Sequence, residues 1–88
     1  MIKVLIVDDS QTVQCFLSEL LGSDPDIEVI GTASSGQEAL KFVSKTIPDV
    51  ITMDLEMPKM SGLEVTREIM ATHPIPICLL YTSPSPRD

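Results

Sequence analysis

Three aspartates follow short, mainly apolar runs in this sequence, and together they could bind a divalent cation. Asp8 and Asp9 come directly after the run 4–7, and Asp54 comes directly after the run 50–53. Carboxylates that lie close together repel one another, and a hard divalent cation relieves that repulsion. Because Mg²⁺ takes one or two carboxylates and leaves room for phosphate oxygens, a set of acids without His or Cys favours magnesium over zinc.

Each acid also has a simpler structural interpretation. Asp8 and Asp9 could form only a strand-to-helix turn, in which Asp9 or Ser10 caps the following helix. Asp54 alone could be a solvated acid in a loop. The combination is more informative than either acid alone, because open α/β sheets bind ligands at the carboxyl ends of neighbouring strands.

Four segments have the composition of buried β-strands, and helical patterns separate them. Each is short, the first is rich in β-branched residues, and the four segments are 4–7, 27–33, 50–53 and 75–80. This alternation predicts a doubly wound α/β fold, with a parallel sheet, helices on its faces and right-handed crossovers. In the strand order 2-1-3, the first and third strands are neighbours and their terminal acids converge.

Helix-start signals precede the three predicted helices. Ser10 is the expected cap of the first helix, while Ser35 with Glu38 and Ser61 with Glu64 fit capping boxes for the others. The first helix has one apolar stripe, formed by Val13, Phe16, Leu17, Leu20 and Leu21. The second is expected to bury Ala39, Leu40 and Val43, and the third to use Leu63, Val65, Ile69 and Met70.

Length and composition exclude several functional classes. The 88 residues suffice for one small domain, and the net charge of −7 argues against binding to nucleic acid. With no Trp, one Tyr and two Phe, the chain also lacks stacking platforms for single strands. Two cysteines form no disulfide scaffold, the start does not resemble a signal peptide, and no apolar run approaches the about 18 residues of a membrane helix. These features predict a cytoplasmic protein without membrane insertion.

The sequence resembles the receiver domain of two-component response regulators over residues 1–77. The matching pieces occur in order and at the family's spacing, and they are 4–10, 48–54, Met57-Pro58 and Gly62. The segments 54–64 and 73–77 look like the receiver of the chemotaxis protein-glutamate methylesterase, with Glu56 as the most specific feature.

This resemblance implies a flavodoxin-like sheet in the order 2-1-3-4-5, truncated here in strand four. It implies that Asp54 accepts a phosphoryl group from a sensor histidine kinase in a phosphorelay. It also implies that Asp9 binds Mg²⁺ directly and Asp8 binds it through water, while Asp54 and the backbone carbonyl of Glu56 complete the ligands. The expected output is a methylesterase domain that acts on chemoreceptors, so the fragment itself would lack the enzyme's catalytic domain.

The end of the chain departs from the family. Residues 78–88 are similar to the translation of a transposase adapter used in sequencing libraries, and we interpret them as an artefact joined to a partial receiver at 1–77. The family's Ser/Thr after strand four is unmatched, because that position falls on Tyr81 and Thr82 comes one residue late. The family's Lys at the end of strand five is absent. We therefore expect this chain to fold with little stability and to be phosphorylated poorly.

Other functions remain open from the sequence. The receiver could serve a DNA-binding output or stand alone, which only the downstream sequence distinguishes. A Mg-dependent phosphatase or nuclease could use the same acids, but it would need a second catalytic acid, for which Asp54-x-Glu56 is a weak candidate. A binding-only pseudo-receiver would lack one acid of the triad, and none is missing.

Overall fold

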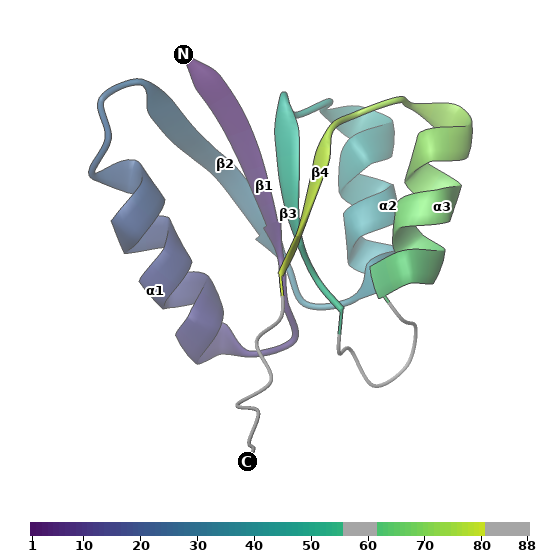
Figure 1. Ribbon diagram of the computed structural model, residues 1–88, viewed down its shortest axis with the longest axis horizontal. Helices are drawn as coiled ribbons and strands as arrows, with labels where there is room; N and C mark the ends of the chain where they lie inside the picture. The colour runs from purple at the N-terminus through teal and green to yellow at the C-terminus, as the bar shows by residue number, and fades with distance from the viewer. Residues whose placement is uncertain (56–61, 81–88) are drawn as a thin grey trace.

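The computed structural model describes residues 1–55 and 62–80, and in these residues strands and helices alternate strictly (Figure 1). The elements are β1 (Ile2–Val7), α1 (Gln11–Gly22), β2 (Ile27–Ala33), α2 (Gly36–Lys45), β3 (Val50–Asp54), α3 (Gly62–Thr72) and β4 (Ile77–Leu80). The predicted alternation is confirmed.

The predicted strand boundaries need small corrections. β2 has the predicted bounds, whereas β1 begins two residues earlier, at Ile2, and β3 extends by one residue to Asp54. β4 begins at Ile77 rather than at residue 75, because Pro76 has no N–H for a sheet ladder and the N–H of Ile75 instead bonds the carbonyl of His73 at 2.7 Å.

The four strands form one parallel sheet in the order β2-β1-β3-β4. The predicted order is confirmed, and β1 and β3 are direct neighbours with Val7 opposite Met53. The pairing of β1 with β2 shifts register between Val4 and Leu5. Because the strands are parallel, their carboxyl ends share one edge of the sheet, which is the lower edge in Figure 1.

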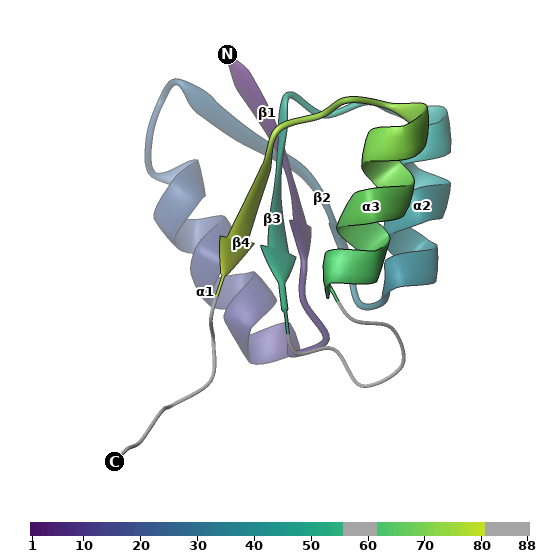
Figure 2. The same ribbon diagram turned by 45° about the vertical axis from the view of Figure 1, so that its right-hand side comes forward.

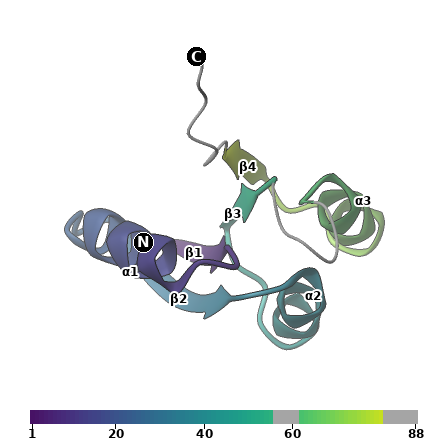
Figure 3. The ribbon, with the colours of Figure 1, turned by 90° about the horizontal axis from the view of Figure 1, so that it is seen from below.

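The helices lie on both faces of the sheet. α1 covers one face, and α2 and α3 lie side by side on the other (Figures 2 and 3). The main core fills the space between the sheet and the α2–α3 layer. Its buried members are Leu5, Val7, Ala33, Ala39, Val43, Ile51, Met53, Val65, Ile69 and Ile75.

The predicted apolar stripes are only partly buried, and four of their residues are exposed instead of packed in the core. In α1, Phe16 is 63% exposed and Leu20 is 56% exposed; in α3, Leu63 and Met70 are exposed. Among the described residues no second helix lies beside α1 on its face of the sheet, so the flank of that helix stays in solvent (Figure 3). Each stripe is wider than the line along which its helix touches the strands.

The caps of the first two helices follow the prediction. Ser10 Oγ accepts the N–H of Val13 at 3.4 Å, and Ser35 Oγ accepts the N–H of Glu38 at 3.2 Å. Glu38 reaches back to the N–H of Ser34 at 2.9 Å, one residue before the cap itself. Ser61, the predicted cap of α3, lies outside the described residues.

Two further expectations concern the last residues of the chain and membrane insertion. Residues 78–80 complete β4, while 81–88 lie outside the described residues, so the boundary at residue 77 and the interpretation of 78–88 stay predictions. In the described part of the chain, no helix combines the length and the apolar character needed to cross a membrane.

Candidate functional site

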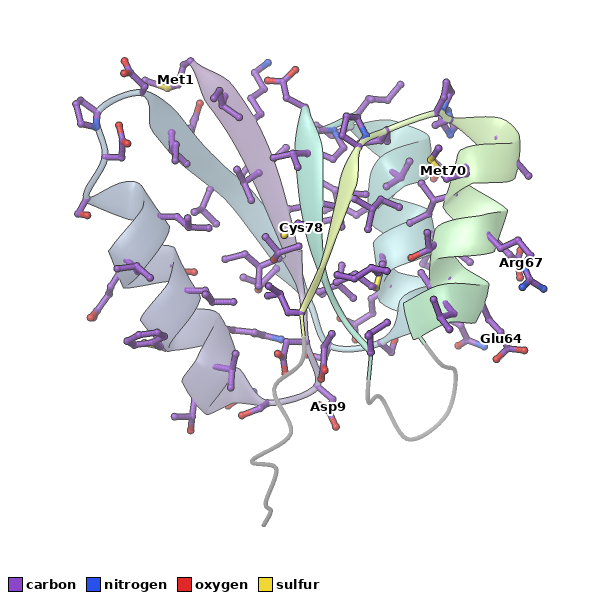
Figure 4. The ribbon with its side chains drawn as sticks, viewed as in Figure 1. Met1, Asp9, Glu64, Arg67, Met70 and Cys78 are labelled. Carbon is purple, nitrogen blue, oxygen red and sulfur yellow. The ribbon has the colours of Figure 1, made fainter. Side chains whose placement is uncertain are left out.

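The three aspartates meet at the carboxyl edge of the sheet. Asp8 and Asp9 follow the last residue of β1, and Asp54 is the last residue of β3. Because these strands are parallel neighbours, carboxylate oxygens of all three residues lie within 4.8 Å of one another. Asp9 projects from this edge in Figure 4, below the ends of the strands.

The three carboxylates differ in their contact with solvent. Asp8 is 1% exposed and Asp54 is 2% exposed, whereas Asp9 is exposed. Asp8 Oδ1 accepts the N–H of Ser10 at 2.9 Å. Asp8 Oδ2 is buried, and none of the described residues gives it a hydrogen bond. A buried carboxylate oxygen without a partner is costly unless a ligand satisfies it.

The surroundings of Asp8 disfavour its charged form. Burial raises the pKa of the Asp8 carboxyl above its ordinary value of 3.8, and the negative charges of Asp54 and Asp9 raise it further. The hydrogen bond from the N–H of Ser10 lowers this pKa, but burial has the larger effect. A cation bound between the three acids would remove the repulsion and stabilise the ionised Asp8.

The donor set fits a hard divalent cation. It consists of carboxylate oxygens from Asp8, Asp9 and Asp54, and it contains neither sulfur nor imidazole. One of these oxygens, Asp8 Oδ2, is buried and has no hydrogen bond from the described residues. The predicted acid cluster is therefore formed. The fourth predicted ligand, the backbone carbonyl of Glu56, lies outside the described residues.

Gly62, singled out in the sequence as part of a motif, packs against the strand end that carries Asp54. A methyl group at Gly62 would overlap the carbonyl oxygen of Asp54 and would lie 3.0 Å from the Cα of Leu55. Both neighbours are backbone atoms, which cannot move aside cheaply. The missing side chain therefore lets the start of α3 approach the site.

One further residue, Gln14, makes a contact with the acid cluster that the sequence analysis did not predict. Gln14 comes three residues before Leu17 of the apolar stripe, and it is the buried residue of α1. Its Nε2 lies 2.5 Å from the carbonyl oxygen of Asp8. The available signal was a polar residue at a position where the spacing predicts burial.

The other titratable candidates stay apart from this arrangement. His73 follows α3, and its Nδ1 lies 3.2 Å from the hydroxyl of Thr72. Cys15 and Cys78 are free and exposed, on α1 and β4 respectively. None of the three belongs to the acid cluster.

Comparison with known proteins connects this site with one family. The profile of the response regulator receiver domain matches residues 4–87. A protein-glutamate methylesterase/protein-glutamine glutaminase of Geobacter metallireducens is 59% identical over 80 residues, which are 91% of this chain and 23% of that protein. The chain thus spans about a quarter of the length of this relative.

Two crystal structures have the same fold. The response regulator domain of Thermotoga maritima CheB superposes with a TM-score of 0.89 at 39% identity, over 93% of this chain and 61% of that one. The response regulator TrrA of T. maritima, solved in complex with Mg(2+)-BeF, superposes with a TM-score of 0.83 at 36% identity, over 96% of this chain and 72% of that one.

Proposed function

This chain belongs to the family of response regulator receiver domains, and we propose that its Asp54 accepts a phosphoryl group from a phosphohistidine on a sensor kinase. One observation carries the proposal. Two adjacent parallel strands bring a carboxylate oxygen of the buried Asp54 within 4.8 Å of those of Asp8 and Asp9, so the proposed acceptor and the proposed cation site would share one edge of the sheet. Phosphoryl transfer needs this combination of a nucleophile and nearby positive charge.

The proposed reaction is an in-line displacement at phosphorus. A carboxylate oxygen of Asp54 attacks, the new O–P bond forms, and the P–N bond to the imidazole breaks. The leaving imidazole nitrogen keeps the electron pair of that bond. The product is an aspartyl phosphate at the end of β3.

We propose Mg²⁺ as the cation of the acid cluster. Asp9 would bind it directly and Asp8 through water, while Asp54 and the backbone carbonyl of Glu56 would complete the ligands. When bound, Mg²⁺ neutralises the charge that develops on the transferred oxygens. Two facts support this choice: the all-carboxylate donor set, and the Mg(2+)-BeF complex of the structurally similar TrrA.

The proposed partners follow from the relatives. We propose that phosphorylation of this receiver controls a protein-glutamate methylesterase output in the complete protein, as the names of the relatives suggest. The added phosphoryl charge would bias the surface that contacts the output domain. We place this phosphoryl transfer in the cytoplasm, where the free and exposed thiol of Cys15 would stay reduced.

A small phosphodonor tests the assignment of Asp54. The 88-residue chain, Asp54→Asn and Asp49→Asn are incubated with phosphoramidate and MgCl₂, and their intact masses are compared. The matched control, Asp49, is an exposed aspartate just before β3, at the opposite edge of the sheet.

We expect one added phosphoryl group in a small fraction of the parent chain and of Asp49→Asn, and none in Asp54→Asn. The added group should disappear when EDTA removes Mg²⁺. Labelling that persists in Asp54→Asn, or a parent chain without any label, would contradict the proposed role.

A further inference from the structure

Gln14 joins the ends of two strands beside the acid cluster. Its side-chain Nε2 donates to the carbonyl oxygens of Asp8, at 2.5 Å, and Ala33, at 3.3 Å, and lies 3.2 Å from the hydroxyl of Ser34. Asp8 comes directly after the last residue of β1. Ala33 is the last residue of β2, and Ser34 comes directly after it. One buried amide on α1 thus contacts backbone from both strands.

These bonds fix the backbone of Asp8 on both sides. The N–H of Asp8 donates to the carbonyl of Ala33 at 2.9 Å, and its carbonyl accepts from Gln14. The carbonyl of Asp8 and the N–H of Asp9 belong to one planar peptide group. Holding that carbonyl therefore also fixes the N–Cα bond of Asp9, from which the second carboxylate is carried.

The amide of Gln14 indicates a role in orienting a predicted metal ligand. Gln14 is the buried residue of α1, and a Leu or Met would occupy a buried position without the cost of burying an amide. The amide is stabilised only because it finds carbonyl partners, and one of these is the backbone of a predicted metal ligand. In metal sites, partners that orient the ligands commonly change metal affinity without touching the ion.

We infer that Gln14 is a positioning residue, whose amide holds the Asp8–Asp9 peptide so that both carboxylates converge with Asp54 on a divalent cation. This inference rests on the proposed magnesium site. It concerns the geometry of the ligands, since Gln14 does not belong to the acid cluster itself.

The test measures Mg²⁺ affinity directly, without phosphorylation. The 88-residue chain is titrated with MgCl₂ and followed by amide NMR, alongside Gln14→Met, which keeps the length of the side chain and removes its donors. A second variant, Gln14→Asn, keeps the amide but shortens its reach by one methylene. Urea titrations give the folded fraction of each variant, and sucrose raises that fraction where necessary without occupying the site.

Two control variants separate positioning from stability. Gln11→Met changes an exposed Gln on the same helix. Ser34→Ala removes the hydroxyl contact of Gln14 and keeps both of its carbonyl partners. We expect both Gln14 variants to raise the Mg²⁺ dissociation constant about tenfold in the folded protein, and both controls to leave it within about twofold. The amide signal of Asp9 should shift in the Gln14 variants and stay in place in the controls.

The outcomes distinguish the inference from the proposed function. If folded Gln14→Met binds Mg²⁺ as tightly as the parent chain, Gln14 only stabilises the fold, and the inference is wrong while the metal site stands. If the parent chain itself shows no saturable Mg²⁺ binding, the proposed site fails and the inference fails with it.

Discussion

Asp8 is held where its own charge is disfavoured. Its side chain is almost fully buried, one oxygen has no hydrogen bond from the described residues, and two further carboxylates lie nearby. Without a cation, this arrangement destabilises the fold. A residue that is needed for a ligand is often costly in the protein that lacks the ligand.

Replacing Asp8 should therefore stabilise the metal-free chain. We expect Asp8→Asn to raise the free energy of unfolding at neutral pH by about 1 kcal/mol, because Asn keeps an acceptor for the N–H of Ser10 and removes a buried charge. Urea denaturation in EDTA measures the change. The control Asp49→Asn alters an exposed aspartate, whose Oδ2 accepts the N–H of Lys3, and should change little; a loss of stability in Asp8→Asn would contradict this account.

The pH dependence of the proposed Mg²⁺ binding should follow from the same residue. The pKa of Asp8 is raised in the folded chain, so in the window above 3.8 the folded state binds more protons than the unfolded state, and stability falls as pH rises through that window. Mg²⁺ requires the ionised carboxylate and must displace this proton. We expect Mg²⁺ affinity to fall as pH is lowered into the window, and Asp8→Asn to lose this dependence; a flat pH profile in the parent chain would contradict it.

At the scale of elements, the contact between α2 and β2 depends on a missing side chain. A methyl group at Gly31 in β2 would overlap the ring of Phe42 on α2, so the glycine provides the space in which that ring lies. Gly31 has no positive φ, so its role is the close approach and not an unusual backbone conformation.

A matched pair of glycine variants tests this contact. Gly31→Ala should lower the free energy of unfolding by about 1–3 kcal/mol, because the ring must leave its position or the helix must move. Gly22→Ala, at the end of α1, meets no atom within 4 Å and should stabilise the chain by about 0.5 kcal/mol through its higher helix propensity. Thermal unfolding followed by circular dichroism compares the two, and equal effects would contradict the packing argument.

At the scale of the whole molecule, the two faces of the sheet contribute unequally to stability. The core cluster lies on the α2–α3 side, where Val65 and Ile69 are fully buried. On the other side, α1 leaves Phe16 and Leu20 largely in solvent. Stability should therefore depend mainly on the α2–α3 layer.

Two truncations compare the faces. We expect Ile69→Ala to cost about 3 kcal/mol, because it leaves a cavity in the core, whereas Phe16→Ala should cost less than about 1 kcal/mol. A domain this small has little stability in reserve, so Ile69→Ala should unfold at markedly lower urea concentration. Similar midpoints for both variants would show that α1 buries more apolar surface than its exposed residues indicate.

The sequence alone determined the features that depend on neighbouring residues. The alternation of strands and helices follows from periodicity within each segment, and the caps at Ser10 and Ser35 follow from residue types at fixed spacing. The positions of Asp8, Asp9 and Asp54 at strand ends are equally local. Their convergence needed only the assumption of the strand order, which the sheet confirms.

Only the tertiary structure decided which side chains are buried and what they contact. Phe16, Leu20, Leu63 and Met70 have the spacing of core residues, yet they are exposed, because burial depends on a second element being present opposite each face. Gln14 is the converse case: a polar residue becomes buried because two strand ends, distant in sequence, offer it carbonyl oxygens. The contact with Ala33 joins residues 19 positions apart, so the spacing within the helix can indicate that Gln14 is buried but cannot identify this partner.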